Sequence, residues 1–216
     1  MTWLALLLSL AACSADLNDL DRPFRTWQAQ KFEHVQRQRT DFTCGSASLS
    51  IIATYYYRKP IKEVAFTAAI RKTYGKEAWN EVERNGLSML DLKHAAEAFG
   101  FAAEGLKLNL AQLRELKGPV VVHLDKGFIR HFSVFKGIEG ERAYLADPIS
   151  GNSREPLYRF LDEWTGYALA IWIDAEELPI TNQLRASSRD VPNELQAGRD
   201  ALYTLPPLTA FSRFAQ

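Results

Sequence analysis

The pattern of apolar residues changes at Gly118-Pro119, and this change constrains the fold more than any other feature. Before it, apolar residues recur at helical spacing and predict helices over residues 44–57, 61–73 and 88–100. After it, short β-branched or aromatic runs bounded by glycine or proline predict strands at 120–124, 131–135, 143–146 and 167–173. A helical half followed by a stranded half predicts an α+β domain, in which the helices pack on an antiparallel sheet.

Three shorter features refine this picture. Ser88 is followed three residues later by Asp91, and Asn109 by Gln112, which is the signature of a helix start with a capping box. We therefore expect the third helix to begin at Ser88 and a short helix to follow Asn109. Residues 156–164 predict a brief helix before the last strand.

Composition excludes several classes of protein. The 216 residues carry 26 Lys and Arg against 26 Asp and Glu, so the chain lacks the positive field that binding to nucleic acid or an anionic membrane requires. An apolar fraction of 47% is too high for a disordered chain. Two cysteines without CxxC or HExxH spacing predict neither a disulfide scaffold nor a metal site, and we expect no cofactor.

The N-terminus predicts export. Residues 3–12 form an apolar run that is too short to span a bilayer, which takes about 20 residues. The run fits the core of a secretory signal over residues 1–15, since small residues follow it, and the expected location is the periplasm. Because no Lys or Arg precedes the run, a buried N-terminal helix is the alternative.

Leu10-Ala11-Ala12-Cys13 also resembles a bacterial lipobox. In that interpretation Cys13 would be lipidated and would anchor the chain, and only then do we expect contact with a membrane. If cleavage follows Cys13, Cys44 is the remaining thiol, and a lone cysteine in an exported protein is either buried and inert or free and reactive.

Cys44 lies where the first long helix is predicted to begin. A helix N-terminus favours a thiolate over a thiol, as a cysteine nucleophile requires. Gly45 would leave room for a substrate backbone beside the sulfur. Position alone is equally compatible with a small buried cysteine that packs a helix end.

Three other residues complete a possible catalytic set. Gln38, six residues before Cys44, could donate to an oxyanion together with the Cys44 N–H, although it could also be an ordinary solvated residue. His131 begins an apolar strand and could serve as the general base, with His123 as its main competitor. Asp147 could orient the imidazole, or it could simply stabilise the turn before Pro148.

The combined pattern resembles a known family. The matching segments are Gln38-(five residues)-Cys44-Gly45, His131-Phe132-Ser133-Val134 and Asp147-Pro148-(two residues)-Gly151. In this order and spacing they resemble the C39 peptidases, papain-like cysteine proteases that process double-glycine leader peptides. The resemblance covers about residues 33–173 and includes the Gly118-Pro119 strand and the ending Glu163-Trp164-Thr165-Gly166.

The resemblance implies a papain-like fold with a set of roles. Cys44 would be the nucleophile, His131 the base, Asp147 the orienting carboxylate and Gln38 the oxyanion donor. The implied function is an exported cysteine endopeptidase that cuts after small residues such as Gly-Gly. Stand-alone exported members occur with secretion systems, so the expected partner is a polypeptide substrate, such as an amyloid subunit or another protein of a secretion operon.

Two other functions stay open at this point. The same cleft could hold an export substrate without cutting it, as a peptide-binding or chaperone module, or the same residues could transfer the acyl group to an amine.

The chain differs from transporter-fused members by its export signal, by the absence of a GxxxxGK[ST] motif and by a C-terminal extension. The expected organisation is a signal peptide (1–15), a lead-in segment (16–32), a C39-like domain (33–175) and an extension (176–216) that is a tail or loosely packed.

Overall fold

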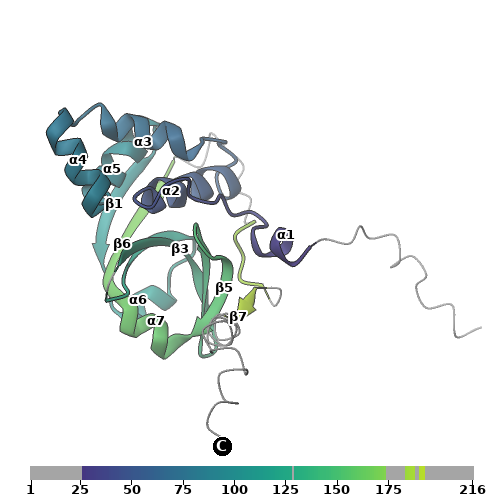
Figure 1. Cartoon of the computed structure of the whole chain (residues 1–216). Helices are drawn as coiled ribbons and strands as arrows, with labels where there is room; N and C mark the ends of the chain where they lie inside the picture. The colour runs from purple at the N-terminus through teal and green to yellow at the C-terminus, as the bar shows by residue number, and fades with distance from the viewer. Residues whose placement is uncertain (1–25, 128, 174–182, 188–189, 193–216) are drawn as a thin grey trace, which may run out of the picture.

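The computed structural model describes residues 26–127, 129–173, 183–187 and 190–192 (Figure 1). The expected signal peptide and Cys13 lie outside these residues, as do most of the lead-in segment and most of the extension. Among the helices of the described part, none combines the length and the hydropathy needed to cross a bilayer.

The helices of the described chain lie mainly in its first half, and two short ones lie between strands. They are α1 (Trp27–Lys31), α2 (Cys44–Tyr55), α3 (Glu63–Arg71), α4 (Lys76–Asn85), α5 (Met89–Ala98), α6 (Leu110–Arg114) and α7 (Leu157–Glu163). The three predicted long helices are confirmed as α2, α3 and α5, and the two predicted capping boxes are present at Ser88 and Asn109. Helix α4 was not expected, because it is mostly polar and buries only Trp79 and Val82.

The strands form a single sheet. They are β1 (Ala102–Lys107), β2 (Val120–Asp125), β3 (Arg130–Glu139), β4 (Arg142–Asp147), β5 (Gly151–Pro156), β6 (Trp164–Trp172) and β7 (Val191–Pro192). Their order across the sheet is β1-β6-β2-β3-β4-β5-β7, and all neighbours are antiparallel except β5 and β7. The four predicted strands are confirmed as β2, β3, β4 and β6. Strands β1 and β5 were missed because neither AAEGLK nor GNSREP is rich in β-branched residues.

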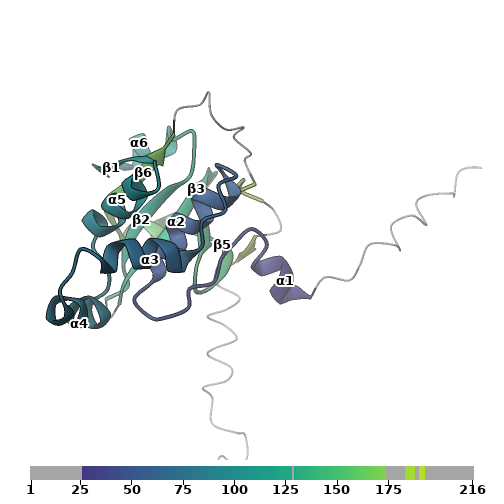
Figure 2. The same ribbon diagram turned by 90° about the horizontal axis from the view of Figure 1, so that it is seen from above.

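Apolar side chains lie on both faces of the sheet. Phe132 and Val134 of β3 belong to the core shared with α2, α3 and α5, whereas Phe135 of the same strand packs with Phe160 of α7. Figures 1 and 2 show α2, α3 and α5 together on one side of the sheet. Burying each such side chain contributes about 1.5–3 kcal/mol, so the two cores hold β3 firmly between the helix layers.

Helix α2 is the centre of the larger core. Its residues from Cys44 to Ala53 are all buried. A helix that is buried on every side has little freedom to shift, because the surrounding core is close-packed. The packing therefore fixes the N-terminus of α2 against β3, and this contact builds the site.

Part of the expected extension packs on the domain. Leu184 is buried in the larger core, and β7 pairs with β5 at the edge of the sheet. The ammonium of Lys136 lies 2.7 Å from Oδ2 of Asp190, and both side chains are buried. In its described residues, 183–187 and 190–192, the extension is thus a segment that packs on the domain.

Candidate active site

Cys44 is the first residue of α2, as the sequence predicted. No side chain caps the start of this helix, because the hydroxyl of the preceding Thr43 bonds with Thr40 instead. Unsatisfied N–H groups at a helix start carry partial positive charge. The sulfur of Cys44 therefore lies beside the partial positive charge at the start of α2.

The backbone of Phe132 connects β3 to the start of α2. Its N–H donates to Sγ of Cys44 at 3.5 Å, and its carbonyl accepts from the hydroxyl of Ser48 at 3.3 Å. These backbone groups are free to reach α2 because the pairing of β3 with β4 begins only at Val134. The sheet thus leaves residues 130–133 of β3 without a partner in β4, and Phe132 of this stretch lies next to the nucleophile.

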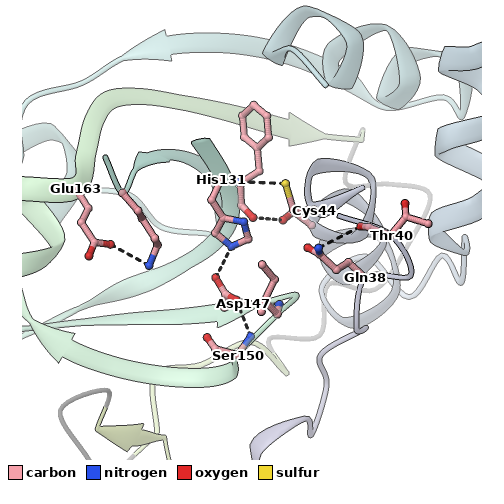
Figure 3. Close-up of polar contacts among 11 residues, drawn as sticks. Gln38, Thr40, Cys44, His131, Asp147, Ser150 and Glu163 are labelled. Atoms are coloured by element: carbon pink, nitrogen blue, oxygen red, sulfur yellow. Dashed lines mark hydrogen bonds and ion pairs between the residues drawn. The ribbon is translucent and has the colours of Figure 1, made fainter. Parts of the chain in front are cut away.

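His131 lies between Cys44 and Asp147 (Figure 3). Its Nε2 donates to Oδ2 of Asp147 at 2.6 Å, and its side chain also bonds with Cys44. Since Nε2 faces the carboxylate, Nδ1 is the ring nitrogen left for the thiol. The fold thereby brings the side chains of Cys44, His131 and Asp147 into one row, although the cysteine and the histidine are 87 positions apart in the sequence.

Asp147 both stabilises the turn and faces the imidazole, which the sequence left as alternatives. Oδ1 accepts from the N–H groups of Ile149 at 2.9 Å and Ser150 at 2.8 Å, which stabilises the turn. Oδ2 is left to face His131. The turn therefore fixes the carboxylate in the orientation that the imidazole needs.

The charges of His131 and Asp147 stabilise each other. Burial lowers the pKa of His131, but the charge and hydrogen bond of Asp147, together with Cys44, raise it to about 10. Burial also acts to raise the pKa of Asp147, but the charge and hydrogen bond of His131 and the two turn N–H groups hold it well below its usual range. The pair is therefore an imidazolium and a carboxylate at neutral pH.

Gln38 lies beside the sulfur in Figure 3 without bonding to it. Its backbone N–H donates to the carbonyl of Pro148 at 3.1 Å, which places it next to the Asp147 turn. Its side-chain amide donates to the carbonyl of Thr40 at 3.1 Å. An amide NH₂ has two protons, so one remains for a further acceptor.

Gly45 has a different role from the expected one. A Cβ atom at this position would lie 2.6 Å from Cδ2 of Leu92. The missing side chain thus lets the first turn of α2 pack closely against Leu92 of α5.

The structure separates His131 from its competitor His123. Nδ1 of His123 lies 3.0 Å from the hydroxyl of Thr165, and this hydroxyl donates in turn to the His123 carbonyl at 3.1 Å. Burial and the charge of Arg130 lower the pKa of His123. His123 is thus held by Thr165, whereas His131 bonds with Cys44.

A cavity of about 760 Å³ opens beside Cys44, between α5 and the sheet. Apolar side chains that include Phe42, Leu106 and Tyr167 line it, with the cations Lys93, Lys107 and Arg130 among them. Sequence reasoning missed this cavity because α5, β1 and β6 reach it from separate parts of the chain. No periodicity within one element signals a surface of that kind.

The comparisons with known proteins agree with this geometry. Residues 32–176 match the model of the peptidase C39 family. The chain belongs to the peptidase C39 family. The peptidase domain of Streptococcus ComA has the same fold, with 22% sequence identity, a TM-score of 0.55 and coverage of 65% of this chain and 98% of that domain. The expected papain-like α+β fold is thereby confirmed.

Two named relatives are more similar in sequence. The chain is 34% identical over 142 residues to the protein named "Probable functional amyloid protease FapD" of Pseudomonas aeruginosa, covering 66% of this chain and 62% of the relative. It is 30% identical over 164 residues to the "Colicin V secretion/processing ATP-binding protein CvaB" of Escherichia coli, covering 74% of this chain and 21% of the relative. The match thus spans less than two thirds of either relative.

Proposed function

We propose that this chain is an exported cysteine endopeptidase that hydrolyses a peptide bond in a secreted polypeptide. The row of Cys44, His131 and Asp147 is the observation that carries the proposal. Membership of the C39 family supports it, and the resemblance implies that the family's nucleophile, base and orienting carboxylate correspond to these three residues.

The first half of the reaction forms an acyl-enzyme. The Cys44 thiolate attacks the scissile carbonyl carbon, and the resulting oxyanion accepts hydrogen bonds from the Cys44 N–H and the remaining amide proton of Gln38. The bond to the leaving nitrogen then breaks, and His131 gives its proton to the amine. Asp147 holds the imidazole in place and stabilises its positive charge until that transfer.

The second half releases the acid. Neutral His131 takes a proton from a water molecule, which attacks the thioester carbonyl. The bond to sulfur breaks, the N-terminal fragment leaves as a carboxylic acid that gives its proton to solvent, and the thiolate–imidazolium pair is restored. An amine in place of water would give acyl transfer, so the acceptor decides between the two reactions.

The substrate part of the proposal draws on the cavity and on the relatives. A polypeptide segment in the cavity beside Cys44 would lie against apolar side chains, and the family resemblance implies small residues such as Gly-Gly before the cut. Because the P. aeruginosa relative carries the name of a functional amyloid protease, we propose an amyloid-forming subunit as the substrate. The periplasm is the proposed location, with lipidation of Cys13 as its anchored form.

Co-expression with the candidate amyloid subunit tests the activity. Mass spectrometry should find a cleaved subunit with the natural chain and an intact one with Cys44→Ala, while the circular dichroism spectrum stays the same. Cleavage by Cys44→Ala contradicts the proposal. Binding of the subunit without cleavage by the natural chain indicates the peptide-binding alternative, in which Cys44 also should not react rapidly with a thiol probe near neutral pH.

The location has its own test. Cell fractionation should find the natural chain in the periplasm, and deletion of residues 1–15 should retain it in the cytoplasm. Labelling with a fatty acid that depends on Cys13 would indicate the anchored form. Equal distribution of both chains contradicts export.

A further inference from the structure

An ion pair outside the row of Cys44, His131 and Asp147 lies at the end of the same strands. Nζ of Lys126 is 3.0 Å from Oε2 of Glu163, and the two side chains are 35% and 24% exposed. Figure 3 shows Glu163 on the opposite side of His131 from Cys44. Its partial burial distinguishes it from the pair of Arg114 and Glu141, which are 3.6 Å apart and 40% and 87% exposed.

Strand register places this pair at the level of the imidazole. Leu124 of β2 pairs with His131 of β3 on one side and with Trp164 of β6 on the other. Glu163 ends α7 directly before Trp164, and Lys126 begins the hairpin that joins β2 to β3. The ion pair thus ties the hairpin that leads into His131 to the junction of α7 and β6.

The ammonium of Lys126 also contributes to the electrostatics of the row formed by Cys44, His131 and Asp147. Burial lowers the pKa of Lys126, but the hydrogen bond and charge of Glu163, and then the charges of Asp147 and Glu155, raise it overall. The charge of Lys126 therefore interacts with the carboxylate that orients His131. Glu163 holds this ammonium in place and compensates its charge.

We propose that Lys126 and Glu163 are positioning residues for His131, which hold the β2–β3 hairpin and balance the charge beside the His131–Asp147 pair. This inference rests on the proposed function, but it concerns the proton balance of the site and not the substrate. Neither residue would touch the reacting atoms.

A charge-balance role differs from a merely structural one in its pH dependence. Removing the positive charge of Lys126 makes the local potential more negative, so every titration in the row moves to higher pH. Removing the negative charge of Glu163 moves the same titrations to lower pH. A lost structural contact would affect both variants in the same direction.

The charged and titratable groups that act on His131, on its neighbour His123 or on Lys126 come from several elements. They are Cys44 of α2, His123 of β2, Lys126 of the hairpin, Arg130 of β3, Asp147 of β4, Glu155 of β5 and Glu163 of α7. Each variant at Lys126 or Glu163 changes one of these groups and leaves the others in place. A shift can therefore be assigned to the altered charge.

The rate of alkylation of Cys44 by iodoacetamide, measured from about pH 4 to pH 10, tests the proposal without any substrate. The parent carries Cys13→Ser, so that Cys44 is its only thiol. We expect the midpoints of the steps in the plot of alkylation rate against pH to move up by about half a pH unit in Lys126→Met. In Glu163→Gln they should move down by a similar amount. Lys126→Arg and the exposed control Glu141→Gln should stay within about 0.2 unit of the parent.

Shifts in the same direction for Lys126→Met and Glu163→Gln, or shifts in neither, would overturn the proposal. An equal shift in Glu141→Gln would do the same. If Lys126→Met does not fold, Lys126→Gln makes the same change of charge. Because alkylation needs no peptide, a failure of the proposed peptidase activity remains a separate result.

Discussion

Nε2 of His131 lies 2.6 Å from Oδ2 of Asp147, and only 4% and 7% of the two side chains are exposed. Solvent screens such a buried pair much less than a surface pair. Each charge therefore depends on the other, and on the two N–H groups that hold the second oxygen of Asp147. This dependence leads to testable consequences for rate and for stability.

Replacing Asp147 by asparagine should lower the rate of peptide cleavage by about three to four orders of magnitude. The amide keeps the size of the side chain but can no longer stabilise the imidazolium or fix its tautomer. Single-turnover kinetics with the cleaved substrate would measure the loss. An unchanged rate would reduce Asp147 to a residue of the turn.

The stability of the natural chain should depend on pH through His131. Its folded-state pKa of about 10 lies above the ordinary value of 6.5, so its contribution is complete below about pH 6.5. As the pH rises toward 10, the unfolded chain loses this proton first, and the free energy of unfolding should fall by a few kcal/mol, since one pKa unit corresponds to about 1.4 kcal/mol.

Asp147 gives the opposite dependence at low pH. Its pKa is lowered by folding, so its contribution is present above the ordinary value of 3.8 and is lost as the pH falls further. Urea unfolding at several pH values would measure the loss of stability on both the acid and the alkaline side. In Asp147→Asn the decline on the alkaline side should largely disappear, and parallel curves for the two chains would contradict this account.

Gly151 should tolerate no side chain. Its φ is +79°, and a Cβ atom would overlap the backbone carbonyl oxygen of Lys31. We expect Gly151→Ala to lower the free energy of unfolding by about 3 kcal/mol, through backbone strain and the overlap together. The control Gly140→Ala has a φ of +57° with open space around the added atom, so it should cost only about 1–2 kcal/mol. Equal losses in urea unfolding would argue against the close approach.

The ion pair of Lys136 and Asp190 should hold the docked segment of the extension. Burial lowers the pKa of Lys136 and raises that of Asp190, so each charge is costly without its partner. Asp190→Ala should destabilise the protein by about 3–5 kcal/mol, and the apolar pair Lys136→Met with Asp190→Leu should recover most of the loss. Removing the exposed charge in Glu141→Gln should change stability by less than about 1 kcal/mol, and an equal loss there would contradict the prediction.

Local patterns determined much of the secondary structure. The spacing of apolar residues predicted α2, α3 and α5, and the capping signatures placed the starts of α5 and α6, because these signals act within a few residues of the chain. Local patterns could not predict strands β1 and β5 or helix α4. Their stability comes from neighbours that are distant in sequence, and their own residues carry a weak pattern.

The sequence by itself determined that Cys44 would begin a helix, that His131 would lie near the start of a strand and that Asp147 would precede a turn. Only the tertiary structure decided that His131, and not His123, bonds with Cys44, that Leu92 fills the space at Gly45, and that Lys126 meets Glu163. Helix starts and turns depend on bonds between residues three or four apart. The choice between two histidines depends on strand register and on the packing of α2 against β3, which join residues almost ninety positions apart.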